Sequence, residues 1–189
     1  RDVLGVLFDV EDKIDEICRL SEAVKKERSN VRMPLLAILP SGNENAYLQL
    51  LKSGIDECFV RPVSPARILN YLQSVVVKKP HLDGPAYVQP ELRQIGEMEL
   101  DNSKRLVKFC NQTIEFSSIE FRLLSRLLEE PGRAFAREEL IDAGWPPNYF
   151  VQPRTVDVHI GRVRRTLRKI TGRSIIRTVR QVGYAAEVD

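Results

Sequence analysis

A basic amphipathic segment near the carboxyl end, residues 154–170, constrains the fold more than any other part of the chain. At about 100° per residue, its apolar side chains form one stripe: Val156, Ile160, Val163, Leu167 and Ile170. The opposite side carries Arg154, Thr155, Val158, His159, Arg162, Arg165 and Lys169. Pro153 ends the loop just before the segment. The spacing predicts a helix that packs one face on a core and presents a basic, hydrogen-bonding face to solvent.

The charge of the chain is concentrated around this segment. Residues 151–189 hold nine Lys or Arg against three acids, whereas residues 1–90 hold twelve of each sign. A strand pair predicted over residues 174–187 adds Arg177, Arg180 and Tyr184. A local excess of positive charge suits a polyanion, and we interpret this region as DNA-binding. The alternatives are a solvated cationic helix face and a surface that binds an acidic protein.

Composition excludes several other classes of protein. With 43% hydrophobic and 29% charged residues, 189 residues can form one large or two small globular domains. Cys18, Cys58 and Cys110 lie far apart in apolar runs, which favours reduced core thiols over a disulfide. Two histidines make a histidine-based metal site improbable. No apolar stretch reaches a membrane-spanning length and the first residues show no signal-peptide pattern, so we expect a soluble, cytoplasmic chain without a membrane partner.

The first half alternates strands with helices. Short apolar runs over residues 3–8 and 35–39 predict two buried strands, and residues 57–60 predict a third strand. Helical spacing follows each of them, at residues 14–24, 46–52 and 64–77. This order predicts α/β architecture with parallel strands.

The residues GIDECFVRPVSPARILNYLQSVV resemble the end of a response-regulator receiver domain. The resemblance implies a flavodoxin-like fold, and in its register residues 3–8 are the family's third strand. Residues 1–77 would then be a receiver-like domain that lacks its first two strands. Either the chain is a fragment of a longer protein or the receiver is naturally shortened.

The receiver resemblance also implies a phosphorylation site, from which this sequence departs. Asp9 matches the phosphoacceptor aspartate, but Arg61 stands in place of the family's lysine. The acids that follow the family's first strand are not in the chain, and Mg²⁺ needs several oxygen ligands. We therefore expect a regulator that does not depend on phosphorylation, is not an enzyme, and requires Mg²⁺ only if the receiver is phosphorylated.

A second role implied by the resemblance is dimerisation through the last helices and strand of the receiver. The matching positions are Tyr47, Glu57, Arg67 and Tyr71. The usual set of salt bridges cannot form whole, but aromatic side chains are favoured in interfaces. The alternative is that both tyrosines are ordinary surface aromatics.

The second half has a different pattern. Residues 78–91 hold three prolines and a glycine and predict a linker. Short strands over residues 95–101, 105–110 and 113–116 predict a small antiparallel sheet. Ser117 and Glu120 have the spacing of a capping box at the start of a helix, and residues 137–145 predict another. With the basic helix and the strand pair, residues 92–189 predict an α+β winged helix-turn-helix.

This half closely resembles the effector domain of OmpR/PhoB-type response regulators, on the motifs RTVDVHIGRVRRTL and RTVRQVGY. The resemblance implies phosphate contacts by Trp145, Arg154, Thr155, His159, Arg164, Thr178 and Tyr184. It implies base contacts by Asp157, Val158 and Arg162, with Arg180 entering the minor groove. Loop 146–153 matches the segment that contacts RNA polymerase, usually its sigma subunit. Gln181 replaces a usual glycine, and Gly161 stands where an arginine is common.

We predict a sequence-specific transcription regulator that binds promoter DNA as a homodimer, through recognition helix 154–170 and wing 174–187. The alternative function is a conventional two-component response regulator that is switched by aspartyl phosphate. For Trp145 and Tyr184, packing in the core is the competing interpretation.

Overall fold

The computed structural model describes residues 5–27, 33–76, 92–147 and 151–188. The chain divides into two compact units, Arg1–Lys78 and Lys79–Asp189. The predicted linker over residues 78–91 lies outside the described residues. Within those residues, no helix combines the length and apolar character needed to span a membrane.

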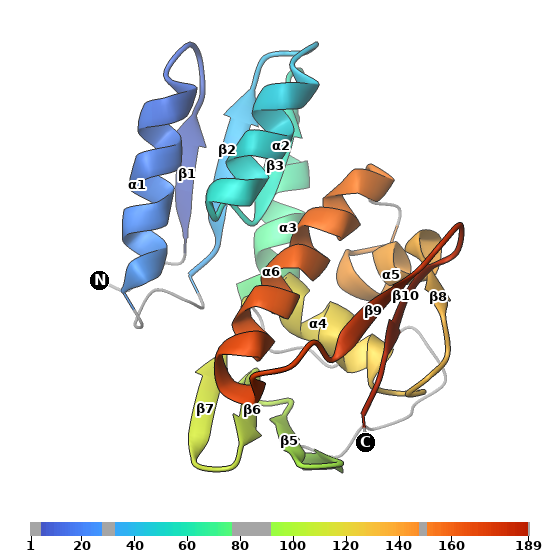
Figure 1. Cartoon of the computed structure of the whole chain (residues 1–189). Helices are drawn as coiled ribbons and strands as arrows, with labels where there is room; N and C mark the ends of the chain where they lie inside the picture. The colour runs from blue at the N-terminus through green and yellow to red at the C-terminus, as the bar shows by residue number, and fades with distance from the viewer. Residues whose placement is uncertain (1–4, 28–32, 77–91, 148–150, 189) are drawn as a thin grey trace. The chain divides into compact units, whose positions relative to one another are not determined.

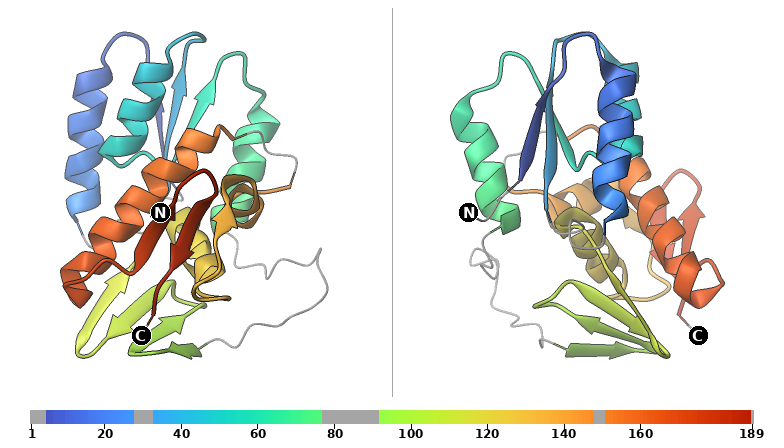
Figure 2. Two further views of the ribbon diagram at one scale, coloured as in Figure 1. Left: turned by 45° about the vertical axis from the view of Figure 1, so that its right-hand side comes forward. Right: turned by 90° about the vertical axis from the view of Figure 1, so that its left-hand side faces the viewer.

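The first unit is a parallel sheet with helices on both faces. Its strands are β1 (Val6–Asp9), β2 (Leu35–Leu39) and β3 (Glu57–Val60), in the order β1-β2-β3. Both strand pairs are parallel. Its helices are α1 (Ile14–Lys26), α2 (Glu44–Ser53) and α3 (Pro65–Val76). Figure 2 shows α1 and α2 on one face of the sheet and α3 on the other. The predicted α/β architecture of a partial receiver is confirmed.

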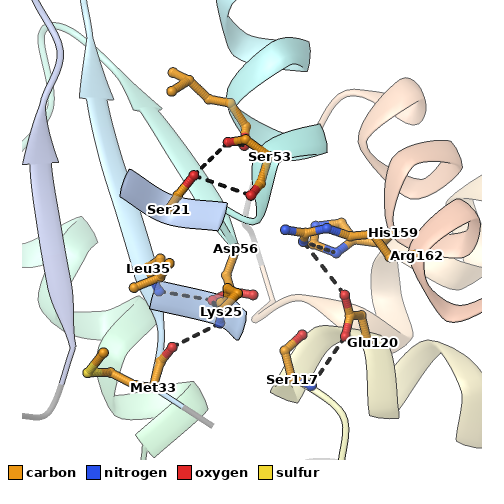
Figure 3. Close-up of polar contacts among 11 residues, drawn as sticks. Ser21, Lys25, Met33, Leu35, Ser53, Asp56, Ser117, Glu120, His159 and Arg162 are labelled. Atoms are coloured by element: carbon orange, nitrogen blue, oxygen red, sulfur yellow. Dashed lines mark hydrogen bonds and ion pairs between the residues drawn. The ribbon is translucent and has the colours of Figure 1, made fainter. Parts of the chain in front are cut away.

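Polar side chains fasten the helices of this unit to its sheet. Ser21 of α1 and Ser53 of α2 share a hydrogen bond of 2.8 Å between their hydroxyls (Figure 3). Lys25 Nζ donates to Asp56 Oδ2 at 2.9 Å, and the backbone N–H of Leu35 donates to the same oxygen at 2.9 Å. Because these groups are largely removed from water, their bonds fix where α1 sits on β2.

The first strand differs from its prediction. Residues 3–8 were expected to form a strand buried on both faces, but β1 covers Val6–Asp9 and Leu7 is 48% exposed. The cause is the position of β1 at the edge of the described sheet, where it pairs with β2 alone. The shift places Asp9 at the carboxyl end of the strand.

The second unit begins with four antiparallel strands. They are β4 (Leu92–Ile95), β5 (Met98–Asp101), β6 (Leu106–Phe109) and β7 (Gln112–Glu115). The prediction of one strand over residues 95–101 is wrong. Gly96 has φ +56°, so the chain turns there and Ile95 pairs with Met98. Glycine adopts this left-handed conformation without the steric cost of a Cβ.

Three helices and a three-stranded sheet complete this unit (Figure 1). The helices are α4 (Ser118–Leu127), α5 (Arg137–Gly144) and α6 (Pro153–Thr171). The strands are β8 (Phe135–Ala136), β9 (Ile176–Val179) and β10 (Gly183–Ala186), in the order β8-β10-β9. The winged-helix prediction is confirmed, with β8 as a third strand beside the predicted pair.

The longest helix, α6, has clear start and stop signals. Pro153 is its first residue and Gly172 ends it with φ +69°, the left-handed geometry of a glycine C-cap. Val156, Ile160 and Val163 are fully buried and Leu167 nearly so. The apolar stripe of the sequence is therefore the face that packs on the core, and the opposite face is left for other contacts.

Candidate nucleic-acid interface

The outward face of α6 carries a strip of positive charge. Arg154, Arg165, Arg168 and Lys169 are all exposed, and they lie within an arc of about 100° around the helix. Gly161 lies in the same strip, and a Cβ built on it would meet no atom within 4 Å. Arg168 and Lys169 also lie in the last turn, where positive charge is favourable at the carboxyl end of a helix. The strip presents a basic surface about 20 Å long, from the rise of about 1.5 Å per residue.

Three residues predicted on this exposed face are enclosed in the structure. Thr155 and His159 have no accessible surface and Arg162 is 9% exposed. Within the second unit, the Trp145 ring lies edge-on to His159, with centroids 5.5 Å apart. Arg162 Nη1 lies 3.7 Å from Glu120 Oε1 and 3.4 Å from His159 Nδ1 (Figure 3). The prediction of exposure is wrong at these three positions. His159 contacts Trp145 and Arg162 faces Glu120 of α4, and the DNA contacts of all three residues stay predictions.

Asp157, a predicted base contact, is held by two donors from other elements. Arg137 Nε, at the start of α5, donates to Asp157 Oδ1 at 2.8 Å. The Tyr184 hydroxyl, on β10, donates to the same oxygen at 2.6 Å. Both bonds end on Oδ1, which fixes the carboxylate while the side chain stays 38% exposed. This cluster joins α5, α6 and the wing at one point.

The contacts of this cluster shift the pKa values of Tyr184 and Arg137. Burial, and then the hydrogen bond to Asp157, raise the pKa of Tyr184 to about 12. The hydrogen bond to Asp157 also raises the pKa of Arg137. Tyr184 therefore remains a neutral donor at any physiological pH, and Arg137 remains a cation beside the carboxylate.

Arg164 ties the same helix to the wing. Its Nη2 donates to Thr178 Oγ1 at 2.8 Å, and its Nε donates to the Ile176 carbonyl at 3.0 Å. The guanidinium groups of Arg137 and Arg164 lie 5.3 and 5.1 Å from the Tyr184 ring centroid. The structure thus brings together three predicted phosphate contacts, Arg164, Thr178 and Tyr184, in one bonded group rather than as separate projecting side chains.

The tip of the wing projects the remaining candidate. Arg180, Gln181 and Val182 connect β9 to β10, and all three are exposed. Arg177 is exposed as well, but its Nε lies 2.6 Å from Glu187 Oε1. Among the described residues no ion pair holds Arg180, so it is the wing arginine that can reach a partner without first breaking such a pair.

Trp145 and the loop after it have different outcomes. Trp145 is 1% exposed, which agrees with the core-packing interpretation rather than an exposed phosphate contact. Residues 148–150 of the predicted polymerase-contacting loop 146–153 lie outside the described residues. Val158 is half-exposed on α6, and its base contact stays a prediction.

The receiver-like unit pairs its candidate phosphoacceptor with an arginine. Arg61 Nη2 lies 2.6 and 2.7 Å from the two carboxylate oxygens of Asp9. The side chains are 44% and 60% exposed, so solvent screens the pair. Among the described residues, no group of three or more His, Cys, Asp or Glu side chains is arranged to hold a metal ion.

The candidate dimer residues are less accessible than expected. Tyr47, Glu57 and Tyr71 are 8%, 1% and 1% exposed, and only Arg67 is exposed. Tyr71 packs edge-on against Phe59, with centroids 5.9 Å apart, and the Tyr47 hydroxyl lies 3.5 Å from Glu57 Oε1. The interpretation of both tyrosines as surface aromatics is wrong.

Sequence reasoning missed two residues of the interface, Arg137 and Glu120. Arg137 lies 20 residues before Asp157 and Glu120 lies 42 before Arg162, so no local spacing connects either pair. Glu120 was assigned to the helix cap alone, and its Oε2 does accept the N–H of Ser117 at 3.3 Å while Oε1 faces Arg162. Because Glu120 has the spacing of a helix cap, the sequence gives no sign of its second contact, with Arg162.

Comparison with known proteins agrees with this architecture. The family model described as "Transcriptional regulatory protein, C terminal" matches residues 111–186. The phosphate regulon transcriptional regulatory protein PhoB of Rhizobium meliloti is 32% identical over 173 residues, which are 91% of this chain and 72% of that protein. PhoB of Pseudomonas aeruginosa is 30% identical over 165 residues, 87% of this chain and 69% of that protein. A solved structure of a RitR mutant covers 97% of this chain and 79% of its own, with a TM-score of 0.63 and 18% identity, and so shares the fold.

Proposed function

Because this chain belongs to the OmpR/PhoB-type family of DNA-binding response regulators, we propose that it binds promoter DNA as a homodimer without a phosphorylation switch. The observation that carries the DNA-binding surface is the exposed basic strip of α6 beside the wing arginine. Arg154 and Arg165 lie on the strip, and Arg180 extends from the wing. Such an arrangement suits a helix in the major groove with a wing over the adjacent minor groove.

We assign base reading to Asp157, Val158 and Arg162 and phosphate contact to Arg154, Thr155, His159, Arg164, Thr178 and Tyr184, following the family's positions. Arg162 faces Glu120 at 3.7 Å, so a bidentate contact from Arg162 to a guanine requires that pair to open. Trp145 is left out of this set because core packing is its competing interpretation and its burial fits that interpretation. Thr155 and His159 are also enclosed, so their proposed phosphate contacts require neighbouring side chains to move.

A selection experiment tests the assignment. The full chain is incubated with a random duplex library, and the recovered DNA is sequenced for wild type and for variants. We expect Arg162→Ala to relax preference at one base position, with a loss of about 1–3 kcal/mol on the preferred site. Arg154→Ala should weaken binding to all DNA sequences by the same factor, because a phosphate contact does not distinguish between bases. Equal losses on selected and random DNA for both variants would contradict the base-reading role.

Independence from phosphorylation is supported by the pair of Asp9 and Arg61. A phosphoacceptor must offer one carboxylate oxygen as a nucleophile, with Mg²⁺ held by further oxygen ligands. Here both Asp9 oxygens accept bonds from one guanidinium nitrogen. The Arg61 guanidinium neutralises the charge of the Asp9 carboxylate, as a bound metal ion otherwise would.

Gel-shift titrations with and without acetyl phosphate and Mg²⁺ test this point on wild type and Asp9→Asn. Arg61→Lys, which restores the family's residue, is the matched control. We expect unchanged DNA affinity for wild type in both conditions. A large phosphate-dependent gain that Asp9→Asn abolishes would support the alternative, a conventional aspartyl-phosphate switch. The exposed position of Asp9 at the end of β1 is the observation that favours this alternative.

A dimer is proposed because one recognition helix and one wing read few base pairs, whereas two linked modules add their contacts. Of the four candidate residues, Arg67 alone is exposed, on α3. We expect Arg67→Glu to shift the protein towards monomer in analytical ultracentrifugation. Arg19→Glu, an exposed charge reversal on α1, is the control. We further propose that loop 146–153 contacts RNA polymerase.

A further inference from the structure

The wing tip holds a side chain in a conformation that glycine ordinarily takes. Gln181 has φ +62°, in the left-handed region, where a Cβ crowds the backbone. It is one of three residues other than glycine with positive φ in the described structure. Its side chain is exposed, and no hydrogen bond to it is found among the described residues. The conformational cost is therefore not offset inside the fold.

The turn around Gln181 is tightly defined. Val179 pairs with Gly183, and the Val182 N–H donates to the Val179 carbonyl at 3.1 Å, so only three residues connect the strands. Gly183 cannot be replaced by a residue with a side chain without moving the backbone, since a Cβ there would lie 2.1 Å from the Phe135 carbonyl oxygen. The hairpin is thus anchored on β8, and its tip points Arg180, Gln181 and Val182 away from the unit.

The chemistry of the tip suits the minor groove of DNA. Arginine is drawn to a narrow minor groove by its negative potential, and an amide NH₂ can donate to adenine N3 or thymine O2. Gln is one of the side chains that minor-groove proteins use to distinguish A·T from G·C pairs, often next to an apolar contact. Val182, 44% exposed, offers that apolar contact. A strained residue whose cost is not repaid internally is a candidate for function.

We propose that Gln181 is a specificity-determining residue, which donates its side-chain amide to A·T base edges in the minor groove beside Arg180. The inference rests on the proposed DNA binding and deepens it. The left-handed turn restricts the directions available to the amide, so the wing enters the groove with this donor already placed.

The experiment uses the full chain and a duplex that it selects from a random library. The base pairs under the wing are made A·T, G·C or inosine·C. Inosine·C has the major groove of G·C but lacks the guanine N2 amino group that obstructs the minor groove. For wild type we expect A·T and inosine·C to bind equally, each about fivefold or more tighter than G·C.

Three variants isolate the amide. Gln181→Ala keeps the Cβ and its strain but removes the amide, Gln181→Gly removes both, and Gln181→Asn keeps an amide in a residue that tolerates positive φ. We expect Ala and Gly to reduce the inosine·C preference by about threefold, while Asn retains part of it. Gln181→Gly should also raise the urea midpoint, so stability and selectivity move in opposite directions. Gln112→Ala, in the exposed β6–β7 hairpin, is the matched control.

Two results would overturn the inference: an inosine·C preference that survives both Gln181→Ala and Gln181→Gly, or a wild type that binds G·C and inosine·C equally. Either leaves the proposed function intact as long as the wild type still selects a sequence. If the wild type selects no sequence at all, the proposed function itself fails.

Discussion

Replacing Arg137 by alanine should weaken the second unit and alter the base contact proposed for Asp157. Arg137 Nε donates to Asp157 Oδ1 at 2.8 Å, and its guanidinium lies 5.3 Å from the centroid of the Tyr184 ring. After the substitution, Tyr184 is the remaining described donor to the Asp157 carboxylate. We expect the carboxylate to turn more freely and its selectivity for an adjacent base to fall.

The magnitude follows from partial exposure. A sheltered hydrogen bond between charged groups contributes about 1.5–3 kcal/mol, whereas an exposed ion pair contributes about 0.2–1 kcal/mol. Arg137 and Asp157 are 30% and 38% exposed, which places their coupling near the lower range, at about 1 kcal/mol. The ring contact adds about 0.5 kcal/mol. Arg137→Ala should thus cost about 1.5 kcal/mol of unfolding free energy.

Trp145 provides the assay, since it is the single tryptophan of the chain and lies in the second unit. Its fluorescence during urea unfolding reports on that unit alone. Unfolding free energies of wild type, Arg137→Ala, Asp157→Ala and the double variant form a cycle that isolates the pair. A coupling energy within about 0.3 kcal/mol of zero would refute this account of the cluster.

Three further predictions concern two positions of the second unit, Gly161 and Tyr184. Gly161→Ala should stabilise the second unit by about 0.5–1 kcal/mol, because its Cβ would meet no atom within 4 Å and alanine is a better helix former. Gly161→Arg should in addition steepen the salt dependence of DNA binding by about one unit of slope, as expected for one added phosphate contact, and an unchanged slope would place the strip away from DNA. The pKa of Tyr184 in the folded protein is about 12, above the ordinary value of about 10. The contribution of the neutral Tyr184 hydroxyl to folding stability is therefore complete below about pH 10 and is lost as the pH rises through about 12. Tyr184→Phe should lower stability at about pH 8 and reduce the loss between about pH 10 and 12; an identical alkaline loss in wild type and variant would exclude this residue as the cause.

Much of the fold could be predicted from local patterns. The apolar run 35–39 is β2, because a strand buried on both faces is apolar along its length, and residues 57–60 are β3 as predicted. Pro153 and Gly172 bound α6 as start and stop residues should. The turn at Gly96 was missed because the residues around it continue to read as a strand, and only the φ of +56° shows the reversal.

The candidate site was less predictable, because a helical projection describes one helix and not its neighbours. It placed Arg162 and His159 on the outward face, whereas Glu120 from α4 and Trp145 after α5 lie against them. Asp157, a base contact implied by the resemblance, is held by two donors from distant parts of the chain. Contacts between residues far apart in the sequence leave no local signal, so tertiary packing decides which polar side chains project.

On the proposed mode of DNA binding, the two departures from the effector-domain motifs have opposite expected effects on DNA recognition. Gly161 removes a side chain from the middle of the basic strip, which lowers the number of phosphate contacts that α6 can make. Gln181 adds a hydrogen-bonding group at the wing tip, at the cost of a left-handed residue. Fewer phosphate contacts from α6 reduce the part of the binding that is independent of sequence. An added contact from the wing increases the part that depends on the base pairs in the minor groove. If this is correct, Gly161→Arg combined with Gln181→Gly should bind DNA more tightly than wild type at low salt and discriminate A·T from G·C flanks less well. A double variant that keeps the flank preference of the wild type would show that the two positions do not share this role.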